Sequence, residues 1–132
     1  MTKVALQTIE SKDVQVGVDA KTGFIRSLIF TKNNVDLFQQ LRQNIPGYVS
    51  QVRVYDELDS VWYNGLLATP IIKKFKKVKN SIQYELTFKG CPFTLTVVLG
   101  FEKEFLRWSV VGQKTNKKVA NRSLRVVFDM PI

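Results

Sequence analysis

Apolar and polar residues alternate along most of the chain with a period of two, the spacing of a β-strand with one buried face. The clearest run is Ile82–Phe88, in which every second residue is apolar and the residues between are polar. The alternation continues in Phe93–Leu99, Phe105–Val111 and Leu124–Phe128. Because short turn-like segments separate these four runs, we predict that they form an antiparallel meander.

The first half of the chain shows the same period less regularly. Further strands are predicted at Val4–Ile9, Val14–Val18, Phe24–Phe30, Tyr48–Tyr55, Val61–Leu67 and Pro70–Val78. Gly23 lies in a turn between two of them, where we expect a backbone conformation that a Cβ would oppose. Residues Val35–Leu41 fit either a short strand or a single helical turn, because their apolar residues also share a helical face. Pro46 is expected to end that element.

These elements predict an all-β domain, an antiparallel β-sandwich with little or no helix. A length of 132 residues suits one domain, so residues 1–132 are expected to form a single β-sandwich. The predicted core contains the large apolar residues of the inward faces: Phe24, Leu28, Phe30, Val52, Val54, Tyr84, Leu86, Phe88, Leu95, Val97, Leu99, Trp108 and Val126.

The lack of histidine restricts the possible chemistry more than any residue that is present. It removes the commonest general base and metal ligand, and it excludes a Ser-His-Asp or Cys-His mechanism within this chain. The single cysteine, Cys91, allows neither an internal disulfide nor a zinc site. We therefore predict no catalytic site here and no cofactor, whatever the activity of a parent protein.

The net charge is +9, and five of the 20 basic residues lie in the run Lys73–Lys79, while the others are scattered along the chain. Regular alternation places Phe75 on one face with Lys73, Lys77 and Lys79, and Ile72 on the other. Neither face is cleanly apolar, which is typical of an edge strand whose lysines block sheet-to-sheet pairing. The alternative is a polyanion-binding surface made by Lys73, Lys74, Lys76, Lys77, Lys79 and Arg107.

A polyanion-binding surface would suit a uronate-rich polysaccharide or phosphate. Nucleic acid is the less favoured ligand, because no aromatic-lined basic groove or known nucleic-acid-binding motif accompanies the lysines.

The segment Val14–Phe30 has a recognisable order of elements. A strand leads into an Asp-x-x-x-Gly turn, and a second strand begins Gly-Phe-Ile-x-Ser-Leu. This order resembles the opening hairpin of galactose-mutarotase-like supersandwich domains, and Asn33–Phe38 is similar to the segment that follows in that family. Such domains form mutarotases, and they also occur as accessory or N-terminal β-sandwiches of bacterial glycoside hydrolases and polysaccharide lyases.

The resemblance implies a carbohydrate-associated module. The family's mutarotase activity uses catalytic His and Glu, so the lack of histidine argues against sugar epimerisation by this chain. A complete supersandwich is also considerably longer. We therefore expect a non-catalytic module excised from a longer carbohydrate-active enzyme. It would pack on, or contribute to, the sugar-binding cleft of a separate catalytic domain.

Four neighbouring residues are the candidates for binding an oligo- or polysaccharide: Tyr55, Trp62, Tyr63 and Asn64. Aromatic faces stack on the C–H groups of pyranose rings, and an amide can hydrogen-bond hydroxyls. Trp62 and Tyr63 are adjacent, so they point to opposite sides of a strand and at most one belongs to the core. The alternative interpretation is that these aromatic residues pack in the core or against another domain.

Three carboxylates cluster in the same region, at Asp56, Glu57 and Asp59. Oxygen-rich loops bind calcium, and paired carboxylates can act on a glycosidic bond. The simplest interpretation is a solvated hairpin corner.

A rival function of another class is a general protein-interaction or adhesion β-sandwich without sugar specificity. No membrane partner is expected, because the longest apolar run, around Val97–Leu99, is too short to span a bilayer. The N-terminus lacks a signal-type apolar core. The protein is then cytoplasmic, or extracellular or periplasmic if the chain is excised from an exported parent.

Overall fold

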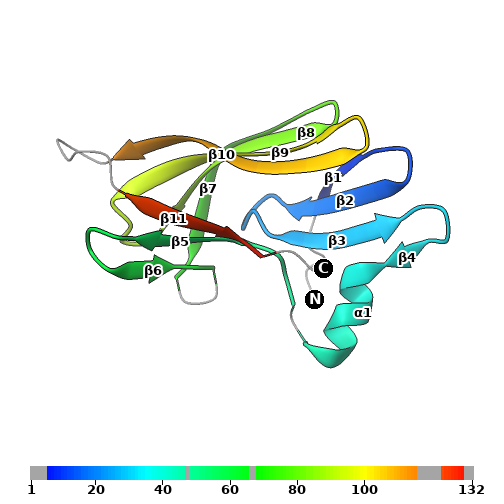
Figure 1. Ribbon diagram of the computed structural model, residues 1–132, viewed down its shortest axis with the longest axis horizontal. Helices are drawn as coiled ribbons and strands as arrows, with labels where there is room; N and C mark the ends of the chain where they lie inside the picture. The colour runs from blue at the N-terminus through cyan, green and yellow to red at the C-terminus, as the bar shows by residue number, and fades with distance from the viewer. Residues whose placement is uncertain (1–5, 47, 66–67, 116–122, 130–132) are drawn as a thin grey trace.

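The computed structural model describes residues 6–46, 48–65, 68–115 and 123–129. These residues form antiparallel β-strands in three sheets, with one short helix (Figure 1). The all-β prediction is therefore confirmed. Residues 4–5 and 66–67, at the ends of two predicted strands, lie outside the described residues.

The first sheet contains four strands in sequence order: β1 (Leu6–Glu10), β2 (Val14–Asp19), β3 (Ile25–Phe30) and β4 (Val35–Asp36). The turn between β2 and β3 contains Gly23, whose φ of +73° confirms the expected conformation. Its N–H donates to the carbonyl of Asp19 over 2.8 Å. An added Cβ at Gly23 would lie 3.0 Å from the ring of Tyr84, so the turn packs directly on the core.

The helix α1 (Leu37–Asn44) follows β4 directly. The Asp36 side chain accepts hydrogen bonds from the backbone N–H of Phe38 (3.0 Å) and of Leu28 (3.2 Å). It therefore caps the helix and ties it to β3. The ambiguous segment is thus a two-residue strand and an eight-residue helix, which is longer than the single turn expected. The helix ends before Pro46, as predicted.

The second sheet is a four-stranded meander of order β10-β9-β8-β7. Its strands are β7 (Pro70–Val78), β8 (Ser81–Phe88), β9 (Phe93–Glu102) and β10 (Phe105–Thr115). We call this second sheet the four-stranded sheet, and the other sheet of four strands, β1-β2-β3-β4, the first sheet. The four-stranded sheet contains three of the four runs that were predicted to form a meander, and it adds β7 at one edge.

The fourth predicted strand, β11 (Leu124–Phe128), does not join β10, so that part of the meander prediction is wrong. It pairs instead with β5 (Val52–Asp56), which pairs in turn with β6 (Val61–Tyr63). Alternation predicts which face of β11 is apolar, but it carries no information about the partner strand. Placing β11 in the other layer lets its Phe128 pack on Trp108 of β10, with ring centroids 5.1 Å apart.

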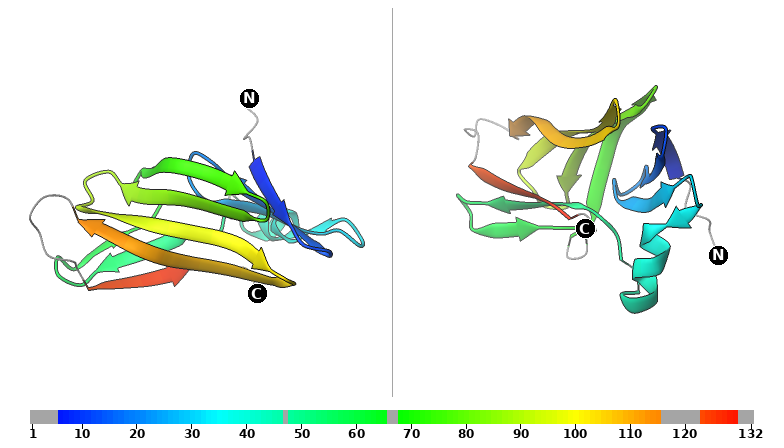
Figure 2. Two further views of the ribbon diagram at one scale, coloured as in Figure 1. Left: turned by 90° about the horizontal axis from the view of Figure 1, so that it is seen from above. Right: turned by 45° about the vertical axis from the view of Figure 1, so that its right-hand side comes forward.

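The molecule is a sandwich whose second layer is divided into two sheets. The four-stranded sheet forms one layer, and the first sheet and the three-stranded sheet lie side by side in the other (Figures 1 and 2). Two backbone hydrogen bonds between Ile25 of β3 and Ser50, just before β5, connect the first sheet to the three-stranded sheet; their lengths are 2.9 and 3.1 Å. Tyr63 joins the layers, because its ring packs on Phe88 and Phe93 at 5.8 and 5.6 Å.

Most of the predicted core is buried in one cluster that takes in residues of all three sheets. The prediction is wrong for Phe30, which is 41% exposed. Phe30 is the last residue of β3, where it pairs with Val14 of β2 and with Val35 of the two-residue strand β4, so it lies at the end of the sheet. Trp108 and Val126 are half-buried at the side of the sandwich. Within the described residues, the helix is too short to cross a membrane.

Candidate functional site

An exposed aromatic pair lies on the outer face of the three-stranded sheet. Tyr55 of β5 and Trp62 of β6 are direct cross-strand partners, with ring centroids 5.0 Å apart and planes inclined by 49°. Their neighbours Val54 and Tyr63 point into the core, so the pair points outward. Trp62 remains 45% exposed, which leaves part of its ring accessible to a ligand.

Two arginines extend this aromatic pair. The guanidinium carbon of Arg53 lies 5.6 Å from the Trp62 ring centroid, and that of Arg125 lies 5.9 Å from the Tyr55 centroid. These distances are typical of cation–π contacts. We call the four residues Arg53, Tyr55, Trp62 and Arg125 the aromatic platform.

Carboxylates hold both arginines of the platform in place. Arg53 makes a bidentate pair with Asp129, at 2.7 and 3.0 Å. Arg125 donates to Glu57 over 2.9 Å. The alternation in β5 places Arg53 beside Tyr55 and could have identified it from sequence. Arg125 could not be assigned to this site, because its place depends on the pairing of β11 with β5.

The other two candidate sugar-binding residues are placed differently. Tyr63 belongs to the inner face and packs between the layers, so it is not part of the outer surface. This confirms that Trp62 and Tyr63 point to opposite sides. Asn64 follows β6, and its carbonyl accepts a hydrogen bond from the backbone N–H of Ala68 over 2.9 Å. The structure therefore brings together Tyr55 and Trp62, but not Tyr63.

The acidic residues form the hairpin loop between β5 and β6. Asp56 is completely buried, and its Oδ1 accepts hydrogen bonds from the backbone N–H of Leu58 (3.0 Å) and Asp59 (3.3 Å). Glu57 is paired with Arg125. In the parts of the chain that the structure describes, no group of three or more acidic or cysteine side chains could hold a metal ion. The contacts of Asp56 thus lie within the loop, and that of Glu57 joins the loop to β11.

The lysine run lies on β7, which is an edge strand as predicted. The prediction of which residues share a face of this strand is wrong, because a β-bulge interrupts the pairing with β8 between Lys73 and Lys76. Lys74 and Phe75 together oppose the single residue Tyr84. Phe75 therefore stacks on Tyr84 at 5.9 Å and lies on the same face as Ile72, not with Lys73.

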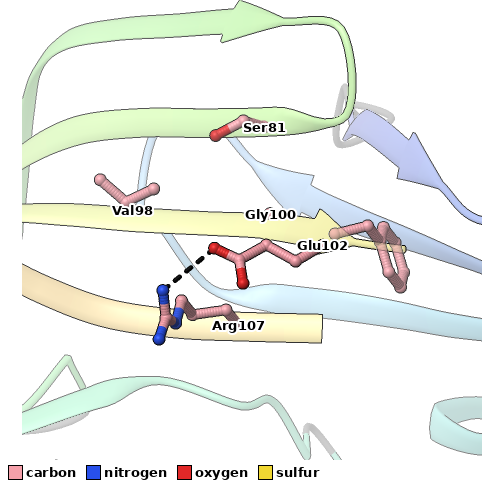
Figure 3. A pocket seen from close by; sticks show the side chains of 6 residues that line it. Ser81, Val98, Gly100, Glu102 and Arg107 are labelled. Atoms are coloured by element: carbon pink, nitrogen blue, oxygen red, sulfur yellow. Dashed lines mark hydrogen bonds and ion pairs between the residues drawn. The ribbon is translucent and has the colours of Figure 1, made fainter. Parts of the chain in front are cut away.

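Arg107 is far from the lysines within the same sheet. It lies on β10, and two strands separate it from β7. It pairs with Glu102 at 3.0 Å, and these two side chains line a hollow of about 200 Å³ with Ser81, Val98, Gly100 and Phe101 (Figure 3). The predicted set of cations thus lies along both edges of one sheet.

Two titratable groups of the core, the Tyr84 phenol and the Cys91 thiol, have raised pKa values. Burial raises the pKa of the Tyr84 phenol, and the nearby indole N–H of Trp108 offsets this only in part. Burial also raises the pKa of the Cys91 thiol, which is enclosed in the core. Both groups therefore stay protonated at neutral pH.

A scan against protein-family models finds no match to this chain, and a search of curated proteins finds none either. The function is therefore inferred from the fold, from the aromatic platform and from the lysine-bearing sheet.

Proposed function

We propose that this chain is a non-catalytic carbohydrate-binding β-sandwich, related to the galactose-mutarotase-like modules of glycoside hydrolases, and that sugar binds on the aromatic platform. The observation that carries the proposal is the exposed Trp62 ring, held beside Tyr55 on the outer face of a sheet. An exposed aromatic surface of this kind can mark a binding site, because several side chains contribute to it together.

The chemistry of the aromatic platform suits a sugar. The C–H groups of a pyranose ring pack on an aromatic face, where the π-system is negative. The guanidinium groups of Arg53 and Arg125 and their carboxylate partners supply donors and acceptors for hydroxyl groups. Because each arginine is paired with a carboxylate, the platform has little net charge. It therefore favours a neutral glycan over a uronate chain.

A second candidate function is a protein interface, with the catalytic domain of a longer parent chain as the partner. Trp, Tyr and Arg are the residues most often found at the energetic centre of such interfaces. The same hairpin also exposes Leu58, at 67%, and Val61. An apolar hairpin tip beside the platform favours this alternative, because a sugar would not need it.

The test is affinity electrophoresis in gels that contain soluble neutral polysaccharides: dextran, galactan, xylan and mannan. We expect at least one of them to retard the wild-type chain. Trp62→Ala should weaken that binding by about tenfold or more, because it removes the stacking surface. The matched control is Phe105→Ala, which removes an aromatic residue that is 77% exposed on the four-stranded sheet.

Two outcomes would overturn the sugar proposal. One is that no neutral polysaccharide retards the wild-type chain. The other is that Phe105→Ala weakens binding as much as Trp62→Ala, which would mean that the platform has no particular role. The first outcome would favour the protein-interface function.

A further inference from the structure

The outer face of the four-stranded sheet is polar and bordered by cations on both edges. It points away from the opposite layer and thus away from the aromatic platform (Figure 1). We call it the lysine-bordered face and define it by these outward residues: Lys73, Lys74, Lys76, Ser81, Gln83, Glu85, Thr94, Thr96, Val98, Gly100, Arg107, Ser109 and Lys114. Two exposed apolar residues lie at its ends, Ile71 on β7 and Phe105 on β10.

The bulge in β7 increases the number of lysines on this face. Lys73 opposes Glu85 and Lys76 opposes Gln83, and both partners point outward because their neighbours in β8 are buried. Lys74, the extra residue, also reaches outward, with its Nζ 3.8 Å from the Glu85 carboxylate. Bulges commonly redirect side chains in this way.

The backbone of Lys74 is strained to achieve this arrangement, since its φ is +53°. The bulge keeps Ile72 and Phe75 on the core while three lysines face outward. A regular strand would have placed Lys73 inward with Phe75, or Lys74 and Lys76 inward with Ile72.

The charges on this face do not balance. Two lysines, Lys74 and Lys114, share the single carboxylate of Glu85, at 3.8 and 3.4 Å. Arg107 is paired with Glu102 at the rim. No ion pair joins Lys73 or Lys76 to any residue that the structure describes. The face and its rim therefore carry five cations and two carboxylates, and they attract a polyanion.

The middle of the face is low because its residues are small. The outward side chains of the central strand β9 are Thr94, Thr96, Val98 and Gly100. Ser109 follows on β10, opposite Val98. The hollow over Gly100 continues this low strip to the Arg107–Glu102 pair, with Ser81 on its other side (Figure 3). The Lys114–Glu85 ion pair crosses β9 beside Thr94 and Thr96, so the open part of the strip runs from Val98 to the hollow. An extended chain can lie along this part with cations at both edges of the sheet.

The geometry points to an anionic linear polysaccharide, of the uronate type, as the ligand of the lysine-bordered face. Its carboxylates meet the lysines, and its hydroxyls meet the Thr, Ser and Gln side chains. Single-stranded nucleic acid fits less well, because Phe105, beside Arg107 on β10, is the one exposed aromatic ring among the described residues of this sheet, and such ligands usually stack several bases on successive rings. β7 and β10 are both edge strands of this sheet, so protection of the edges is the rival explanation for the cations on either strand, and it predicts no binding of polygalacturonate.

The test measures binding of polygalacturonate by affinity electrophoresis at low salt. Lys73→Gln combined with Lys76→Gln should weaken binding roughly tenfold, because two exposed charge contacts are lost. The matched control is Lys12→Gln with Lys32→Gln, which removes two exposed lysines from the first sheet and should leave binding within twofold. Added salt should weaken wild-type binding.

Trp62→Ala should leave polygalacturonate binding unchanged. The experiment therefore tests the lysine-bordered face separately from the proposed sugar site on the aromatic platform. Any of four outcomes would overturn the inference. They are no binding by the wild-type chain, equal losses in the two lysine pairs, a loss of binding in Trp62→Ala, and tighter binding of polyuridylate than of polygalacturonate. The second would mean that total charge alone attracts the polymer.

Discussion

Asp56 shows how a residue that suggests chemistry in the sequence can have a structural role. Its carboxylate is buried, and one oxygen atom accepts two backbone N–H groups of the β5–β6 loop. This arrangement orients the hairpin that carries Trp62 on its second strand. An Asp at the start of a turn commonly accepts hydrogen bonds from the backbone N–H groups that follow it.

Replacing Asp56 should therefore destabilise the protein. Asp56→Ala leaves two backbone N–H groups without this acceptor, and we expect the free energy of unfolding to fall by about 2–3 kcal/mol. Asp56→Asn keeps an acceptor oxygen and should lose less than half of that. The measurement is urea denaturation followed by circular dichroism. The exposed Asp13→Ala serves as control, and an Asp56→Ala protein as stable as wild type would contradict this role.

At the scale of elements, the β7 bulge reconciles two demands on one strand. The core needs Ile72 and Phe75 on the same side, although they are three residues apart. Regular alternation puts residues three apart on opposite faces. The extra residue Lys74 corrects the phase at the cost of a strained backbone.

Deleting Lys74 should consequently be tolerated. The remaining sequence alternates regularly, so Phe75 would oppose Tyr84 and Lys76 would still oppose Gln83. We expect the free energy of unfolding to change by less than about 1 kcal/mol, because the lost ion pair is offset by relief of strain. Thermal melting measures this. Deleting Gln83 from β8 is the matched control: it reverses the faces of half a central strand and should prevent folding. A Lys74 deletion that unfolds the protein would contradict the explanation.

At the scale of the whole molecule, three sheets share one core. The buried cluster includes Val16 of the first sheet, Val54 of the three-stranded sheet and Val97 of the four-stranded sheet. The two proposed binding surfaces lie outside this core, on the outer faces of opposite layers. A ligand on one face therefore leaves the other free.

A shared core predicts a single cooperative unfolding transition. Trp62 and Trp108 report on different layers, so Trp108→Phe and Trp62→Phe each leave one fluorescent reporter. In each variant, the urea midpoint from fluorescence should coincide with the midpoint from circular dichroism. Clearly separated midpoints in either variant would show that the layers unfold independently.

The sequence by itself determined the strands, most of the inward faces and the edge position of the lysine run. These properties follow from a period of two, which is local to each strand. It also placed Trp62 and Tyr63 on opposite sides. The resemblance to galactose-mutarotase-like domains proposes a family, and that proposal rests on the Val14–Phe30 hairpin and on the segment Asn33–Phe38 that follows it.

Only the tertiary structure decided how the strands combine. The pairing of β11 with β5 brings Arg125 to Tyr55, although the two residues are 70 positions apart in the sequence (125 − 55 = 70). The bulge at Lys74 depends on packing against Tyr84 in the next strand. Strand pairing and bulges are set by contacts between distant parts of the chain, and a local alternation pattern is compatible with several such arrangements.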